Sequence, residues 1–457
     1  MEEKKDMNTK MDMLHGSIWN KILQYAIPVA ATGILEQLFN ASDIAIVGNF
    51  TGEAKTVAVA AVGANSPIVG LLLNFFIGIA LGANVVIANA VGKGDKESIH
   101  KAVHTSIITA VVGGLLVTVF GELFIGRLLQ MLNVPDDVFN YALLYIRIYL
   151  VGMPVILLYN FEAAIFRSVG ETKTPLKALA ISGVLNVLLN MFFVIVLKMT
   201  VNGVAIATVI SNAVSSVILF VKLAKSESEV RIRRSDLKFD GSIFKKIIQI
   251  GLPAGIQSAV FAIANIVIQS AINSLGTVVI AASSAAFNIE IFAYDVFNSF
   301  SQACTTFTGQ NYGAGNLKRC RKVLVLCIIE DVIATATVII IVLLSGRMLL
   351  SVFNNDAQVI DIGYIRLKTV FLAYIFSMLY ENMSGYLRGF GISFVPALLT
   401  VIGVCGVRIL WIFTVFPAHR TFQAIMFAYP VSLSVTAFLI FGAVMVYRPS
   451  HRGVGKS

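Results

Sequence analysis

The segment Ile18–Pro28 reads IWNKILQYAIP, and a second segment, Ile243–Pro253, reads IFKKIIQIGLP. Each one opens a series of long apolar runs. Further pairs follow in the same order at nearly the same spacing: GRLL from Gly126 and GRML from Gly346, YIRI from Tyr145 and YIRL from Tyr364, RSVG from Arg167 and RGFG from Arg388. Repeated matches of this kind indicate that the chain is an internal duplication.

The composition places both halves in a membrane. Hydrophobic residues make up 57% of the 457 residues and charged residues only 13%, whereas soluble domains carry about a quarter charged residues. About 20 apolar residues cross a bilayer as a helix. Twelve such stretches are predicted, at 22–48, 57–88, 99–125, 138–168, 176–197, 203–222, 245–274, 278–310, 321–345, 360–388, 394–416 and 422–447.

The basic residues predict the orientation. The formal charge of +10 is concentrated in the short loops on the side of the termini, including the polar stretch from Lys222 to Lys246. This bias predicts that both termini are cytoplasmic and that the chain is a multi-pass protein of the cell membrane. It also explains the positive charge without a nucleic-acid partner.

The polar stretch divides the chain into residues 1–222, a cytoplasmic linker at 223–242, and residues 243–457. Six spans per half give both halves the same orientation. The predicted fold is therefore an all-α integral membrane protein with two six-helix bundles related by a pseudo-two-fold axis along the membrane normal. In transporters with such parallel repeats, the substrate site lies between the halves near the midplane.

Motifs for enzymatic chemistry are not found. The four cysteines form no CxxC pair, and the sequence GKGD at Gly92 lacks the spacing of a phosphate-binding loop. We therefore expect no enzyme activity and no cofactor.

Three motifs carry a resemblance to a known family. They are Pro28 followed by DIAIVG at Asp43, GQNYGAGN at Gly309–Asn316, and the pair RSVG and RGFG. With these motifs the chain resembles multidrug and toxic compound extrusion (MATE) transporters of the bacterial DinF and MepA-like branch. The resemblance implies two six-helix lobes around a V-shaped cavity and export of organic cations or other xenobiotics, including antibiotics, against inward sodium or proton flow.

Polar side chains recur along one face of the first span, at Thr32, Glu36, Asn40 and Asp43. A carboxylate at the centre of a membrane helix costs about 2.5–3.5 kcal/mol, so it requires a partner or a cavity. We expect Asp43 to bind the coupling cation, with Glu36 and Asn40 as candidates for substrate or coupling roles. The alternative is that Asn40 and Thr32 only join helices through hydrogen bonds.

Asn186 and Asn190 lie one helical turn apart in the fifth span, and Thr208 follows in the sixth. In sodium-binding relatives, an acidic residue on the first helix joins an Asn and an Asp on the fifth and a Thr on the sixth. The resemblance therefore implies a sodium or proton site at Asp43, Asn186, Asn190 and Thr208, in which Asn190 replaces the Asp. An asparagine pair that only connects helices is the alternative.

Four more acidic residues in predicted spans are candidates for coupling or for binding a charged substrate: Glu162, Glu290, Asp295 and Glu381. For Glu290 and Glu381, the alternative is pairing with an arginine in or near a span, such as Arg147, Arg366 or Arg408.

These features predict a secondary active antiporter for small organic molecules, chiefly cations, that works as a monomer among membrane lipids. A flippase for a lipid-linked saccharide is the alternative within the same broad fold, but it would require a cationic cavity. An integral membrane enzyme is the second alternative.

Overall fold

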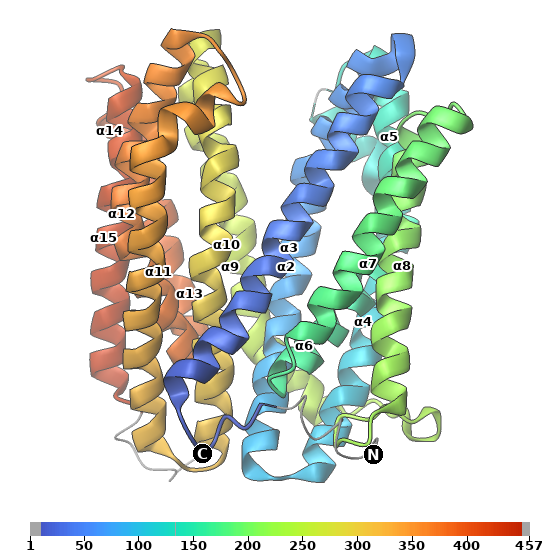
Figure 1. The fold of residues 1–457 in the computed structure, drawn as a ribbon, viewed down its shortest axis with the longest axis vertical. Helices are drawn as coiled ribbons and strands as arrows, with labels where there is room; N and C mark the ends of the chain where they lie inside the picture. The colour runs from blue at the N-terminus through green and yellow to red at the C-terminus, as the bar shows by residue number, and fades with distance from the viewer. Residues whose placement is uncertain (1–10, 133, 450–457) are drawn as a thin grey trace. The chain divides into compact units, whose positions relative to one another are not determined.

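The computed structural model describes residues 11–132 and 134–449, and within them the secondary structure is helical (Figure 1). The first seven helices are α2 (Ile18–Phe50), α3 (Lys55–Lys93), α4 (Lys96–Met131), α5 (Asp136–Val151), α6 (Met153–Ser168), α7 (Lys173–Met191) and α8 (Val201–Lys225). The others are α9 (Gly241–Asn273), α10 (Thr277–Gly313), α11 (Leu317–Ser351), α12 (Ala357–Gly389), α13 (Phe394–Thr400), α14 (Val407–Thr414) and α15 (Phe422–Tyr447).

Each of the twelve predicted spans coincides with a helical pass in the described part of the chain. Ten passes are long and apolar enough to cross a membrane, and the bent pair α5 and α6 provides an eleventh. The remaining pass, α12, has 33 residues but carries five charged side chains, at Asp361, Arg366, Lys368, Glu381 and Arg388. The predicted all-helical membrane fold is confirmed.

Three of the passes are not regular α-helices. The fourth bends by 51° between α5 and α6, where Gly152 precedes Met153 and Pro154. Proline removes a backbone donor and clashes with the preceding turn, so it is tolerated best in the first turn of a helix and kinks or breaks a helix elsewhere. The fifth pass ends in the π-helical turn η2 (Phe192–Val196), and the eleventh contains η4 (Val401–Gly406) between α13 and α14.

The contacts divide the chain into two compact units. The first comprises Ala31–Ala90 and Asp95–Ile248, and the second comprises Asp12–Ala30, Val91–Gly94 and the chain from Gln249 onward. The sequence suggested a division at the linker alone. In the structure, α2 contributes its first part to the second unit and its remainder to the first.

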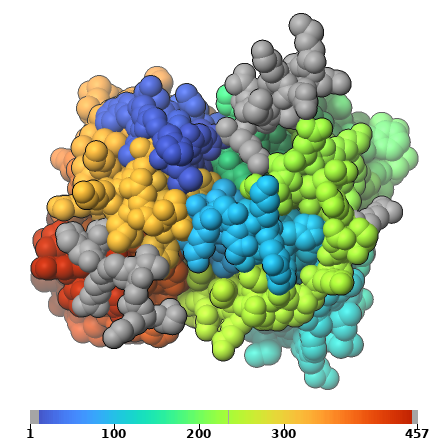
Figure 2. All heavy atoms as spheres, turned by 90° about the horizontal axis from the view of Figure 1, so that it is seen from below, coloured from blue at the N-terminus to red at the C-terminus, as the bar shows by residue number. Residues whose placement is uncertain are grey.

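The N-terminal segment Asp12–Ala30 is bound to the second unit by polar contacts. The guanidinium of Arg319 donates to the carbonyl oxygens of Met13 at 3.2 Å and of His15 and Gly16 at 3.1 Å. The hydroxyl of Tyr25 lies 2.9 Å from that of Thr306. Figure 2 shows the blue atoms of this segment against the yellow and orange atoms of the second unit. These contacts give the start of α2 partners outside its own half of the duplication.

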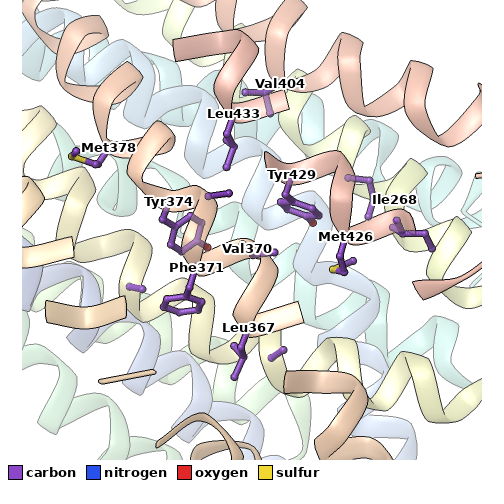
Figure 3. Close-up of a cluster of buried hydrophobic side chains, with 14 of the residues drawn as sticks. Ile268, Leu367, Val370, Phe371, Tyr374, Met378, Val404, Met426, Tyr429 and Leu433 are labelled. Carbon is purple, nitrogen blue, oxygen red and sulfur yellow. The ribbon is translucent and has the colours of Figure 1, made fainter. Parts of the chain in front are cut away.

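The apolar interior of the second unit centres on α12. Phe371, Tyr374, Tyr429 and Met426 lie together between α12 and α15 (Figure 3). Because lipid tails are as apolar as these side chains, close packing rather than exclusion of water stabilises such a cluster in a membrane. This cluster packs beside α10 and α12, the helices that carry the buried residues Glu290 and Arg366.

Candidate ion-binding site

Three helices of the first unit place polar side chains around Asp43. The carboxylate comes from the part of α2 that belongs to this unit, the two asparagines from α7, and Thr208 from α8. A spacing of four residues puts Asn186 and Asn190 on one face of α7. Asp43 is 7% exposed and Asn190 is 0% exposed. The four residues of the predicted site are therefore brought together inside one unit.

Hydrogen bonds connect all four residues. The amide of Asn190 donates to Asp43 Oδ1 at 2.5 Å and to Asn186 Oδ1 at 3.1 Å. The hydroxyl of Thr208 donates to Asp43 Oδ2 at 3.2 Å and accepts from the amide of Asn186 at 3.5 Å. Both carboxylate oxygens of Asp43 are therefore held by neutral groups.

Asp43 lacks a basic counter-ion in the described part of the chain, where its polar partners are Asn190 and Thr208. An ionised carboxylate buried without a positive partner is costly, so the group favours binding a cation or a proton. The carbonyl oxygen of Asn190 is also buried and accepts no hydrogen bond. Carboxylate, amide and hydroxyl oxygens are the ligands of hard cations. The residues present therefore fit a sodium ion or a proton.

Tyrosines also lie near this cluster, and the sequence did not predict this for Tyr145 and Tyr149. Tyr145 and Tyr149 lie one turn apart on α5 and near Asp43. Tyr149 and Tyr159 lie near Glu36, which is half-buried on α2. Tyrosine faces attract cations. Their spacing of four residues in the fourth predicted span was the available signal.

The other candidates of the first unit lie outside the Asp43 cluster. Asn40 is exposed on α2. Glu162 is buried between α6 and α8, where one carboxylate oxygen accepts from the hydroxyl of Ser216 at 2.9 Å and the other has no hydrogen-bond partner.

In the second unit, Glu290 and Arg366 form a buried bidentate ion pair with N–O distances of 2.6 and 2.8 Å. Arg366 also donates to the hydroxyl of Ser283 at 2.6 Å. The alternative of pairing with a buried arginine is thus what the structure shows for Glu290. Arg147 pairs instead with Glu122 at 3.3 Å.

The remaining two candidates of the second unit are not part of this pair. Asp295 is half-buried on α10, and one of its carboxylate oxygens has no hydrogen-bond partner. Glu381 is buried on α12 close to Tyr380 and Arg388.

Two more acidic residues, Glu330 and Asp331, were missed. They lie within the predicted span 321–345 on α11 and are 2% and 0% exposed. The signal was a pair of carboxylates in the middle of an apolar run.

Comparisons with known proteins show that the chain is similar in sequence to membrane transporters of one family. A family model described as MatE matches residues 28–192 and 253–414. The chain is 25% identical over 436 residues to the probable multidrug resistance protein YoeA of Bacillus subtilis, covering 93% of each protein. It is 26% identical over 396 residues to the probable multidrug resistance protein NorM of Thermotoga maritima, covering 86% of this chain and 84% of that protein.

Among solved structures, an outward-facing multidrug resistance MATE family transporter of the MOP superfamily matches with a TM-score of 0.89. The two sequences are 22% identical, and the match covers 96% of this chain and 98% of the other. The two segments matched by the family model follow the two halves of the duplication. The resemblance inferred from the sequence motifs is confirmed: the chain belongs to the MatE family, whose members are transporters and not enzymes.

Proposed function

We propose that this protein exports small organic molecules, chiefly cations, by antiport against sodium ions or protons, and that Asp43, Asn186, Asn190 and Thr208 bind the coupling ion. The observation that carries the proposal is the environment of Asp43. Its carboxylate is buried in the first unit and bonded to an amide and a hydroxyl, without a basic counter-ion in the described part of the chain. Relatives named as multidrug resistance proteins support the class of cargo.

The hydrogen bonds allow reversible binding of a cation. In the ionised state, Asn190 and Thr208 donate to the two oxygens of Asp43. A hydroxyl both donates and accepts, so Thr208 can rotate to accept from a protonated Asp43. A sodium ion would instead bind the oxygens of Asp43, Thr208 and Asn190, after the Asn190 amide turns its free carbonyl oxygen toward it.

Competition between ion and cargo supplies the coupling. Tyr145 and Tyr149 lie near Asp43, and their aromatic rings can attract an organic cation that replaces the inorganic one. Exchange of one sodium ion for one monovalent cation moves no net charge, so the membrane potential does not drive it. A tenfold sodium gradient would then supply about 1.4 kcal/mol, enough for about a tenfold gradient of the cargo.

The protein is expected to act as a monomer in the cell membrane with both termini cytoplasmic. The basic loops on the side of the termini support this orientation. No resident cofactor is part of the proposal.

The test is efflux of ethidium from proteoliposomes under separately imposed sodium and pH gradients. Wild-type protein should respond to one of the two gradients, and Asp43→Asn should lose at least about tenfold of the gradient-driven rate because a neutral amide cannot exchange a cation. Asp361→Asn is the matched control, since this exposed carboxylate pairs with Arg347 at 2.5 Å. Undiminished gradient-driven efflux by Asp43→Asn would reject the role of Asp43. Gradient-independent transfer of a lipid-linked saccharide, with no ethidium efflux, would favour the flippase.

A further inference from the structure

A second carboxylate centre lies inside the second unit, between α11 and α12. Asp331 and Asn382 are both 0% exposed. The amide of Asn382 donates to Asp331 Oδ2 at 2.5 Å, and the hydroxyl of Thr335 donates to Asp331 Oδ1 at 3.0 Å. The same amide also donates to the carbonyl oxygen of Met378 at 2.9 Å, which fixes its orientation.

The charges around Asp331 do not balance. Arg366 is used by Glu290, and Arg388 donates to Gln257 at 3.0 Å. In the described chain, the polar partners of Asp331 are Asn382 and Thr335, while Glu381 adds a second negative group nearby. An ionised carboxylate that is buried without a positive partner destabilises the folded protein. Asp331 therefore favours binding a positive charge.

Two more observations point to the same requirement. The carbonyl oxygen of Asn382, on the amide that contacts Asp331, is buried and accepts no hydrogen bond. Glu330, the preceding residue on α11, is also buried, and neither of its carboxylate oxygens has a hydrogen-bond partner. Buried polar atoms are normally paired, so unpaired acceptors beside a carboxylate indicate a place for a proton or a cation.

The Asp331 centre resembles the Asp43 cluster in its chemistry but not in its position. Both contain an aspartate bonded to an amide at 2.5 Å and to a threonine hydroxyl, and both leave the amide oxygen unpaired. The position that the duplication pairs with Asp43 is Ile268 on α9. The second centre is therefore not a copy of the first.

We propose that Asp331 binds and releases a proton inside the second unit, at a site separate from the Asp43 cluster. On protonation, an O–H bond forms at Oδ1, and the hydroxyl of Thr335 rotates from donor to acceptor while Asn382 continues to donate to Oδ2. On release, the proton leaves Oδ1 and Thr335 donates again. Both states keep the two hydrogen bonds, which a reversible site requires.

Other titratable side chains lie near Asp331 on α10, α11 and α12. Helix α11 packs against α10 and α12. Glu330 and Cys327 lie on α11 itself, Cys304 on α10 interacts with Cys327, and Glu381 on α12 faces Asp331. Any measurement of Asp331 must separate its proton from theirs.

Infrared difference spectroscopy of the full chain in lipid nanodiscs, between acidic and alkaline pH and without any substrate, provides the test. All proteins carry Asp43→Asn, so that Asp43 does not contribute, while Glu162 of the first unit contributes equally to every protein compared. We expect a protonated-carboxyl band that Asp331→Asn removes, together with uptake of about one proton fewer per molecule by pH-indicator titration. Asp331→Glu should restore a titrating band at a shifted frequency, and Asp361→Asn, which removes an exposed carboxylate, should leave the Asp331 band in place.

Two results would overturn the proposal. The first is an identical band and an identical proton count with and without Asp331→Asn, in proteins that elute as the wild type does. The second is loss of the band when sodium is raised at constant pH, together with saturable ²²Na⁺ binding that Asp331→Asn abolishes. This result would show that the site binds sodium and not a proton. Because no substrate is present, neither result depends on whether the Asp43 cluster drives export.

Discussion

At the scale of single residues, the chemistry of the first site depends on a neutral amide. Asn190 donates to Asp43 at 2.5 Å, at a position where the resemblance to sodium-binding transporters implies an aspartate. A second carboxylate at this position would add charge and oxygen ligands, both of which strengthen binding of a hard cation. The amide therefore favours weaker sodium binding or a proton.

Asn190→Asp should raise the affinity for sodium by about tenfold or more, because ligand charge sets the affinity of hard-cation sites. Equilibrium binding of ²²Na⁺ to purified protein measures the change. Asn273→Asp, at the exposed end of α9, adds the same charge away from the cluster and serves as the control. Equal affinity in the wild type and in Asn190→Asp would show that this side chain does not contact the ion.

Glu290→Gln should destabilise the second unit by about 3–5 kcal/mol, because it leaves the buried guanidinium of Arg366 without a counter-ion. Thermal unfolding in detergent measures the loss. The double variant with Arg366→Met should recover most of it, since both charges are then removed. Breaking the exposed pair of Asp361 and Arg347 with Asp361→Asn should cost at most about 1 kcal/mol. A stable Glu290→Gln protein that has lost only ion coupling would contradict the structural role.

At the scale of helices, α10 and α12 approach closely because α12 carries small residues. A Cβ at Gly385 would lie 2.6 Å from the carbonyl oxygen of Ser301, and one at Gly389 would lie 2.7 Å from Cβ of Thr308. Glycines four residues apart let membrane helices pack backbone to backbone. The close approach also allows the hydroxyl of Ser301 to donate to the carbonyl oxygen of Glu381 at 2.8 Å.

Gly385→Ala should destabilise the protein by about 1–3 kcal/mol, because the added methyl group must displace the backbone of α10. The measurement is the midpoint of thermal unfolding. Gly442→Ala on α15 is the matched control, since a Cβ there meets no atom within 4 Å. Equal midpoints for the two variants would contradict this prediction, because they would show that α10 and α12 can accommodate a methyl group at Gly385.

At the scale of the whole molecule, the orientation in the membrane can be tested without removing any native cysteine. All four cysteines, Cys304, Cys320, Cys327 and Cys405, are buried. A cysteine introduced at an exposed loop should therefore dominate the reaction with a membrane-impermeant maleimide.

Lys238→Cys in the linker should react only after the membrane is permeabilised, whereas Arg420→Cys should react in intact cells. The distribution of basic residues predicts that the linker is cytoplasmic and that the loop of Arg420 is outside. The unmodified chain provides the background. The opposite pattern, in which Lys238→Cys reacts in intact cells and Arg420→Cys does not, would show that the orientation is the reverse of the one proposed.

Much of the site was predictable because the relevant residues are unusual where they stand. Asp43 is a carboxylate in an apolar run, and Asn186 and Asn190 share a helical face. The resemblance to known transporters then grouped them with Thr208. The partner of Glu290 was not predictable, because Arg366 lies on another helix and several arginines were available.

The sequence by itself determined the class of protein, the twelve passes and the duplication. Lipid offers the backbone no hydrogen bonds, so each apolar run must satisfy its own groups as a helix whatever its neighbours do. Tertiary structure alone decided that Asp12–Ala30 packs in the second unit and that Asp331 meets Asn382. These outcomes depend on how each helix is rotated against the others, which is set by side-chain packing between segments far apart in the chain.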